Sequence, residues 1–340
     1  MRTSSHPRSE VEEPGRPAAL RWTGAGSGGH SFWLLRRRRR PHPLGPRHRP
    51  SRVPGGPGVK PIILAFETSC DETAVAVVRG TEALSNVLSS QVDLHARFGG
   101  VVPEVAARAH VEAIRSLTHR ALYEAGVHPD DLDGVAATSG PGLVGALLVG
   151  HSFAKATAWS RHLPFVGVDH MEGHLMAPRL QFEEFRPPAV VLLASGGHSQ
   201  IVHVRDWGEY ETLGQTIDDA AGEAFDKLAR VMGLGFPGGP AIDKASDGGD
   251  PNAVRFPRAL PDRPFHFSFS GLKTAVVTYI EKARESGDLP SLADMAASVQ
   301  EAIVDVLVDK TFAAVDETGA WIVGGGGGVL ANRRLRHRFA

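Results

Sequence analysis

The sequence predicts an α/β protein of two lobes that hold a nucleotide between them. Three strand-like runs each end in a turn of small residues, at positions 139–143, 195–199 and 324–328. Such turns bring backbone N–H groups close to an anion, above all where a helix follows. Each half of the chain also alternates strands with helices, and 340 residues are enough for two lobes with a large core.

The predicted fold class is α/β, as a duplicated actin-like ATPase fold. That fold, shared with Hsp70-like proteins and sugar kinases, brings hairpin and glycine-rich turns of both lobes to the phosphates. A Rossmann fold is disfavoured because no G-x-G-x-x-G follows the first strand, and no Walker A motif is present. The last predicted helix follows Asn332 and the sequence stops inside it at Ala340, so we expect an incomplete C-terminal lobe. The predicted division is a basic segment at 1–59, an N-terminal lobe at 60–184 and a C-terminal lobe at 185–340.

Charge is unevenly distributed along the chain. Residues 1–60 hold 13 Lys and Arg but 3 Asp and Glu, which leaves 24 and 35 for residues 61–340, a formal charge of about −11. A body so acidic is not expected to bind nucleic acid over a wide surface by itself, so local basic strips or a partner would have to help. We interpret residues 1–59, which are rich in Pro, Gly, Arg and Ser, as a disordered tail or as translated upstream sequence. A transit peptide and an RNA-binding tail are the alternatives.

The single cysteine, Cys70, indicates the compartment. An intramolecular disulfide cannot form, so we expect a reducing cytoplasm. Cys70 is predicted to be a small buried side chain rather than a nucleophile. Because no apolar run reaches the length of a bilayer span, no membrane partner is expected.

The N-terminal lobe is predicted to begin with a hairpin. Strands at 61–66 and 74–78 flank an acidic turn at 67–73. So many carboxylates on one turn repel each other unless a cation or several donors bind them, although a solvated turn is an equal alternative. The elements expected next are a helix over 103–126, a strand over 134–138, a glycine turn over 139–143 and a helix over 144–159.

Two histidines follow the next predicted strand, which ends at Asp169. His170 and His174 lie four residues apart at the start of a helix, so their rings project from one face about one turn apart and can hold a divalent metal. Glu172 lies about 200° round the helix from His170, unlike the acid of His-Glu-x-x-His zinc proteases. We therefore predict a metal site rather than a zinc peptidase, with paired surface or core histidines as the alternative.

The C-terminal lobe is predicted to repeat the arrangement. Two strands within 188–204 join through the turn 195–199, where hydroxyls and His198 can donate to an anion. A helix is expected to begin at Asp218, with Asp219, Glu223 and Asp226 on one acidic face that could bind a ribose or a metal-bound water. Solvation of this face, with Glu223 paired to Lys227, is the alternative. The remaining elements are a strand-like stretch over 265–274, a helix over 292–317, a strand over 321–323 and a glycine loop over 324–328.

Seven motifs together resemble a single family. They are Glu-Thr-Ser-Cys-Asp-Glu-Thr at 67–73, Ser-Gly-Pro-Gly-Leu-Val-Gly-Ala at 139–146, His-Met-Glu-Gly-His at 170–174, Ser-Gly-Gly-His at 195–198, Ile-Asp-Asp-Ala-Ala-Gly-Glu-Ala-Phe-Asp-Lys at 217–227, Phe-Ser-Phe-Ser-Gly-Leu-Lys at 267–273 and Ala-Asn at 331–332. In this order they are similar to the bacterial tRNA threonylcarbamoyladenosine transferases, formerly labelled O-sialoglycoprotein endopeptidases. The resemblance covers residues 61–340 and implies the actin-like fold.

The resemblance also implies an activity. Threonylcarbamoyl-AMP would donate its threonylcarbamoyl group to the exocyclic amine of the adenosine beside the anticodon, in tRNAs that read codons beginning with A, and AMP would leave. One divalent metal, usually iron in bacteria and otherwise zinc, would be held by His170 and His174. A third ligand, an Asp in a Cys-Thr-Asp-Asn segment, is expected beyond Ala340. The implied partners are tRNA, a shorter paralogue of the same fold, a small P-loop ATPase and an enzyme that makes the adenylate.

The donor site follows from the same resemblance. The residues implied to lie along the adenylate are Leu193, Ala194, Ser195, Gly196 and Gly197, and those implied at its nucleoside are Asp226, Gly239, Asp243 and Asn332. The transfer has to align an aromatic amine with a carbonyl, stabilise negative charge and remove a proton. Asp71, Glu72 and His198 are the candidate proton acceptors, and the sequence leaves the three open. A metal-dependent glycoprotein endopeptidase and a non-catalytic nucleotide-binding partner of the same fold are the alternative functions.

Overall fold

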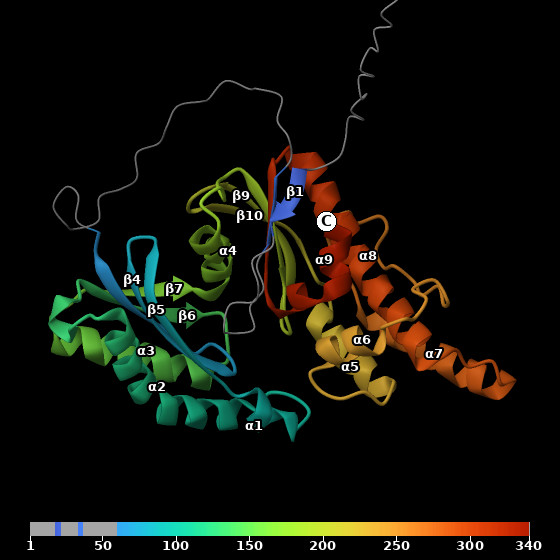
Figure 1. Cartoon of the computed structure of the whole chain (residues 1–340), viewed down its shortest axis with the longest axis horizontal. Helices are drawn as coiled ribbons and strands as arrows, with labels where there is room; N and C mark the ends of the chain where they lie inside the picture. The colour runs from blue at the N-terminus through green and yellow to red at the C-terminus, as the bar shows by residue number, and fades with distance from the viewer. Residues whose placement is uncertain (1–17, 22–32, 37–59, 340) are drawn as a thin grey trace, which may run out of the picture.

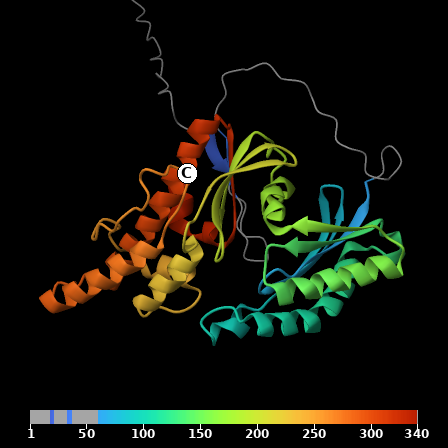
Figure 2. The same ribbon diagram turned by 180° about the vertical axis from the view of Figure 1, so that it is seen from behind.

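Two mixed sheets organise the computed structural model, which describes residues 18–21, 33–36 and 60–339 (Figures 1 and 2). Buried residues alternate with partly exposed ones along two strands of the first sheet, Ile62–Glu67 and Glu72–Arg79, so one face of each is buried. The strands of the first sheet are β3 (Ile62–Glu67), β4 (Glu72–Arg79), β5 (Glu82–Ser90), β6 (Gly134–Gly140) and β7 (Phe165–Asp169). Those of the second are β1 (Ala18–Arg21), β2 (Trp33–Arg36), β8 (Ala189–Ala194), β9 (Ser199–Asp206), β10 (Glu209–Gln215) and β11 (Ile322–Gly326).

The two sheets share one strand order, which confirms the predicted duplicated fold. The first runs β5-β4-β3-β6-β7 and the second runs β10-β9-β8-β11-β2-β1. In each of these orders the first three strands form an antiparallel meander, and the fourth strand pairs in parallel with the third, β6 with β3 and β11 with β8. They differ at the fifth position. There β7 lies parallel to β6, whereas β2 lies antiparallel to β11.

Helices cover the outer face of each sheet. In the N-terminal lobe these are α1 (Val92–Ala96), α2 (Pro103–Ala125), the short η1 (Pro129–Asp131) and α3 (Val144–Ser160). In the C-terminal lobe they are α5 (Ala221–Val231), α6 (Gly238–Ala245), α7 (Ser270–Ser286), α8 (Leu292–Thr318), η2 (Gly328–Ala331) and α9 (Arg333–Phe339). Pro103 starts α2 because its missing N–H has no helical partner there, and Gly126 ends it at a φ of 63°.

The helix α4 (His170–Gln181) connects the lobes (Figure 1). It follows β7 of the first sheet, yet its Leu175 packs into a cluster with Val191, Leu193 and Ile322 of the second. The first turn of α4 therefore lies where the two lobes face each other. The predicted lobe boundary at residue 184 stays a prediction.

Three local expectations were wrong. Residues 265–274 do not form a strand, because Asp218 accepts hydrogen bonds from the backbone N–H groups of Phe269 and Ser270 and α7 begins at Ser270. For the same reason Asp218 is not the start of α5, which begins at Ala221. The glycine run enters β11 as far as Gly326, since backbone pairing with β8 needs no side chain.

Most of the segment predicted as a disordered tail, residues 1–59, lies outside the described residues. Two short stretches of it are described, and both form strands. Trp33–Arg36 pairs with the edge of β11, and Ala18–Arg21 pairs with Trp33–Arg36. An open strand edge offers unpaired N–H and C=O groups, which explains this pairing. Among the described residues, no helix is long and apolar enough to cross a membrane.

Candidate active site

The histidine pair sits at the first turn of α4. The Asp169 side chain accepts hydrogen bonds from the backbone N–H groups of Met171 (2.8 Å) and Glu172 (3.1 Å), so the helix begins at His170. The Nε2 atoms of His170 and His174 face each other at 3.1 Å, which confirms that the two rings converge.

Three N-terminal side chains hold His170. Its Nδ1 lies 3.2 Å from both Ser69 Oγ and Glu67 Oε2, and Thr138 donates its hydroxyl to Glu67. Burial opposes ionisation of Glu67, but hydrogen bonds and charge from His170, with hydrogen bonds from Ser69 and Thr138, outweigh it and lower the pKa of Glu67 to about 2. Glu67 is therefore an ionised acceptor, and Nδ1 of His170 carries the proton that faces it. That tautomer leaves the Nε2 lone pair directed at His174.

This arrangement fits two ligands of one metal ion. With metal–nitrogen bonds of about 2.0–2.1 Å, two imidazole nitrogens on one ion lie about 3.0 Å apart at octahedral angles and about 3.4 Å apart at tetrahedral angles. The observed 3.1 Å falls in that range. A carboxylate on the far nitrogen, as Glu67 is on His170, is the usual support of a metal-binding imidazole. No group of three or more ligand side chains is present in the described part of the chain.

The turn between β8 and β9 meets the histidine pair from the other lobe. Ser195 closes this turn, because its backbone N–H donates to the His198 carbonyl at 2.8 Å and its Oγ accepts from the His198 N–H at 3.1 Å. The His198 ring centroid lies 6.4 Å from that of His170. Burial, and then the neighbouring His170, lower the pKa of His198, so its ring is neutral at pH 7. The predicted meeting of the histidines with this turn is confirmed.

Glycines let a second loop approach each turn. A Cβ on Gly142, in the loop before α3, would lie 2.6 Å from the carbonyl oxygen of Ser69. Gly327, after β11, has a φ of +109°, and a Cβ there would overlap the carbonyl of Ala194. At the tip of the turn, Gly196 and Gly197 are exposed. Their Cβ positions meet no heavy atom of the described residues within 4 Å, so a ligand has room to approach.

Three of the four predicted nucleoside residues lie on α5 and α6. Asp226 accepts the Gly238 N–H at 2.6 Å, and Gly239 lies half-buried in the first turn of α6. Burial raises the pKa of Asp226, against the opposing hydrogen bond from Gly238. Asp243 is held by Arg333, whose Nε donates to it at 2.9 Å. Of the acidic face predicted on α5, Asp219 and Glu223 instead pair with Lys227 at 2.7 and 2.9 Å.

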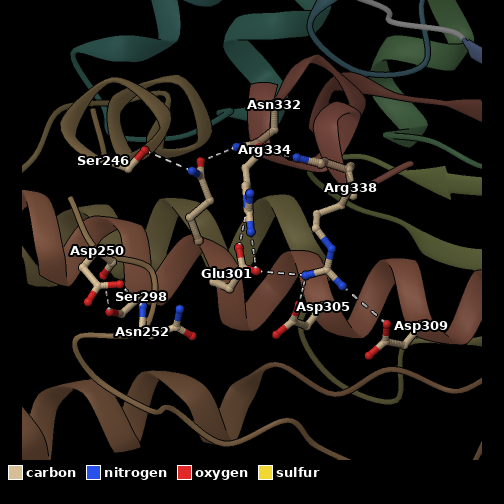
Figure 3. A network of polar contacts seen from close by, with 12 residues as sticks. Ser246, Asp250, Asn252, Ser298, Glu301, Asp305, Asp309, Asn332, Arg334 and Arg338 are labelled. Atoms are coloured by element: carbon tan, nitrogen blue, oxygen red, sulfur yellow. Dashed lines mark hydrogen bonds and ion pairs between the residues drawn. The ribbon is translucent and has the colours of Figure 1, made fainter. Parts of the chain in front are cut away.

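Asn332 is bound into a polar network between α6, α8 and α9 (Figure 3). Its side-chain amide donates to Gln300 Oε1 at 2.6 Å, its Oδ1 caps α9 at the Leu335 N–H, and Gln300 donates to Ser246 on α6 at 3.0 Å. Asn332 is 7% exposed. In this structure the side chain of Asn332 therefore fixes the junction of α6 and α9, and its contact with a nucleoside stays a prediction.

Other predicted residues occupy different surroundings. The side chains of Leu193 and Ala194 are buried in β8, so only their backbone faces the turn. Cys70 was expected to be buried, but it is exposed. Desolvation of the thiol and the carboxylates of Asp71, Glu67 and Glu72 raise its pKa to about 12, so it is no thiolate nucleophile. Asp71 therefore lies beside Cys70.

Glu172 lies on the other side of α4. Tyr210 of β10 donates its hydroxyl to Glu172 Oε1 at 3.1 Å. This contact holds the acid toward the second sheet and agrees with its predicted direction away from the metal face, which disfavours the zinc-peptidase alternative.

Sequence reasoning placed Glu67 and Ser69 in the acidic turn 67–73 without linking them to the histidine pair, and it did not single out Thr138 or Gln300. One signal for Glu67 was available, because a charged residue ends an otherwise apolar strand. The partnership of Thr138 with Glu67 spans 71 positions and had no signal in the sequence.

Two facing lobes of one topology, with small-residue turns and a histidine pair between them, define an actin-like ATPase-type protein. The fold is shared with T. kodakarensis HypF at a TM-score of 0.53 and 14% identity, over 83% of this chain and 44% of that one. The sequence model of the tRNA N6-adenosine threonylcarbamoyltransferase family matches residues 82–340. This chain is similar to proteins of that name from two bacteria. It is 51% identical to the one from Clostridium perfringens, over 82% of this chain and 83% of that one, and 52% identical to the one from Clostridium novyi, over 81% of each. The chain belongs to this family of transferases.

Proposed function

We propose that the protein transfers a threonylcarbamoyl group from threonylcarbamoyl-AMP to N6 of the adenosine beside the anticodon, in tRNAs that read codons beginning with A. The observation that carries the proposal is the meeting of His170 and His174 with the Ser195–His198 turn between the lobes. One lobe thereby offers a place for the acyl group and the other a place for the adenylate.

The C-terminal turn would hold the AMP part. Exposed glycines at 196 and 197 let backbone N–H groups approach phosphate oxygens. Gly222, in the first turn of α5, supports the turn because its N–H donates to the Ser195 carbonyl at 3.1 Å. Asp226, Gly239 and Asp243 continue along the nucleoside side. Leu193 and Ala194 would contribute through their backbone, because their side chains are buried.

His170 and His174 would hold one divalent metal, iron or zinc, with Glu67 fixing the orientation of His170. When bound, such an ion supplies a Lewis acid for the carbonyl or a grip on the threonyl group. Ser69 and Thr138 keep Glu67 ionised and in place.

His198 is our choice for the residue that takes the amine proton. It is neutral at pH 7, it lies on the adenylate turn and its ring faces His170. Asp71 lies beside the Cys70 thiol, and Glu72 begins β4. These two remain the competing candidates.

Partners and compartment are part of the proposal. Residues 61–340 carry a net negative charge, so we expect partner subunits to contribute to tRNA binding. A shorter paralogue of the same fold would cover the apolar side chains that α2 and α3 expose to solvent. These are Val111, Tyr123, Val144, Leu148 and Trp159, each more than half exposed. A small P-loop ATPase and a cytoplasmic location complete the assignment.

The experiment is transfer of label from [14C]threonylcarbamoyl-AMP to tRNA by the full chain with its partner subunits. Label should appear on a tRNA reading a codon that begins with A. It should be absent from the same tRNA with guanosine in place of the adenosine beside the anticodon. Equal labelling of both tRNAs, or of neither, would reject the proposal.

A further inference from the structure

The acidic turn of the N-terminal lobe is held by its backbone carbonyls. Three consecutive carbonyl oxygens accept hydrogen bonds from three different elements. Ser69 O accepts the Leu143 N–H at 2.8 Å, Cys70 O lies 3.0 Å from Nε2 of His110, and Asp71 O accepts the Gln91 N–H at 3.0 Å. The first and third donors are backbone groups. The second, His110 on α2, is a side chain that a substitution can remove.

The surroundings of His110 determine its tautomer. The side chain is fully buried. A carbonyl can only accept, so Nε2 must carry the proton that faces Cys70 O. Nδ1 must then accept, and it receives the hydroxyl of Thr73 at 2.7 Å and the side-chain amide of Gln91 at 3.3 Å. Burial lowers the pKa of His110, in agreement with a neutral ring.

The same pattern continues to the start of α2. The Gln91 amide also donates to the Ala106 carbonyl at 3.4 Å, and its Oε1 lies 3.1 Å from Nε2 of His95. Nδ1 of His95 lies 3.3 Å from the Val102 N–H, which donates to it. When both His95 and His110 carry their proton on Nε2, every hydrogen-bond donor of this network has an acceptor. A fully satisfied buried network fixes a single geometry, because any rotation leaves a polar atom unpaired.

We propose that His110 is a positioning residue for the active site. As its neutral Nε2–H tautomer, it fixes the Cys70 carbonyl and thereby the turn that presents Glu67 and Ser69 to His170. It touches neither the histidine pair nor the adenylate turn, so it acts through the turn. The kinetic test described next rests on the proposed transfer reaction, whereas the NMR test of the His110 tautomer does not depend on it.

Three substitutions separate positioning from packing. In His110→Gln the amide nitrogen replaces Nε2 and can still donate to Cys70 O. His110→Asn keeps an acceptor for Thr73 but cannot reach Cys70, and His110→Phe keeps the ring volume without either bond. We expect kcat within about 3-fold of wild type for Gln, and about 10-fold to 100-fold lower for Asn and Phe, with KM for tRNA unchanged. His119→Gln, at an exposed position of the same helix, is the matched control and should leave kcat unchanged.

If His110 served core packing alone, Phe would be the most active variant and Gln would fall with Asn. That order, or equal activity of all three, would overturn the proposal. Long-range 1H–15N NMR of 15N-histidine-labelled wild-type protein gives a second answer that needs no activity. The His110 signals, assigned by their loss in the Gln variant, should show the neutral Nε2–H form from pH 6 to 8. An Nδ1–H tautomer, or a charged ring at pH 7, would refute the assignment even if the Asn and Phe variants fail to fold.

Discussion

The turn after β3 and the turn after β8 occupy the same position in two sheets of one topology, yet they carry opposite chemistry. The first holds Glu67, Asp71 and Glu72, whereas the second is Ser-Gly-Gly-His with no carboxylate. In each, a glycine of the loop after the fourth strand lies against the turn backbone, Gly142 in one lobe and Gly327 in the other. The duplicated scaffold therefore supplies the same support twice, and the residues at the tips decide whether a lobe attracts a cation or an anion.

The lobes also differ in how their sheets are covered. The C-terminal sheet has α8 on one face and α4 on the other. On the N-terminal sheet, α2 and α3 cover one face, and the opposite face carries a hollow of about 210 Å³ whose lining includes five alanines and Glu67. The inner face of the first sheet is thus more accessible, and α4 explains why, since it follows the first sheet but packs on the second.

The largest expected effect tests which lobe supplies the residue that takes the amine proton. His198→Ala should lower kcat by about 10²-fold to 10⁴-fold, the usual contribution of a general base. Asp71→Asn and Glu72→Gln should lower kcat far less. The pH dependence of kcat should show an acid limb below the ordinary histidine pKa of 6.5, because burial and His170 lower the pKa of His198. Single-turnover transfer at several pH values measures both. A larger loss in Asp71→Asn would move the proton acceptor to the N-terminal lobe.

The next largest effect concerns the supporting glycines. Gly327→Ala combines a clash with the Ala194 backbone and a left-handed φ, so it should lower the free energy of unfolding by about 3 kcal/mol. Gly142→Ala clashes with Ser69 but its φ is not left-handed, so about 2 kcal/mol is expected. Urea unfolding measures both. Gly271→Ala on α7, where a Cβ meets no atom of the described residues within 4 Å, should be neutral or slightly stabilising. Equal free energies of unfolding for all three variants would show that the loops carrying Gly142 and Gly327 can move away from the turns without loss of stability.

The smallest effect is electrostatic and belongs to the C-terminal lobe (Figure 3). Burial would raise the pKa of Asp305, but Arg258 and Arg338 outweigh it and hold the pKa below the ordinary 3.8. A carboxyl with a lowered folded-state pKa stabilises the fold above its unfolded pKa, and this contribution is lost as the pH falls through the folded value. We expect Asp305→Asn to lower the free energy of unfolding by about 1 kcal/mol at pH 6, and by progressively less as the pH falls below 3.8, measured by urea unfolding over this pH range. A cost independent of pH would point to packing instead.

The site was predictable where local residues carry it. His170 and His174 were found because their spacing shows on any helix, and the turn 195–198 was found from its glycines between two apolar runs. The wrong strand at 265–274 and the displaced start of α5 share one cause. Asp218 caps a helix 52 positions away, and no local pattern reveals so distant a partner.

The sequence by itself determined the class of fold, the position of the turns and the pair of imidazoles, because period, glycine placement and i, i+4 spacing are local properties of a chain. Only the tertiary structure decided that Glu67, Ser69 and Thr138 fix His170 and that His198 approaches His170 from the other lobe. It also decided that His110 holds the turn that carries Ser69. Those contacts join residues up to 103 positions apart, and their geometry exists only once two sheets and the helix between them have packed.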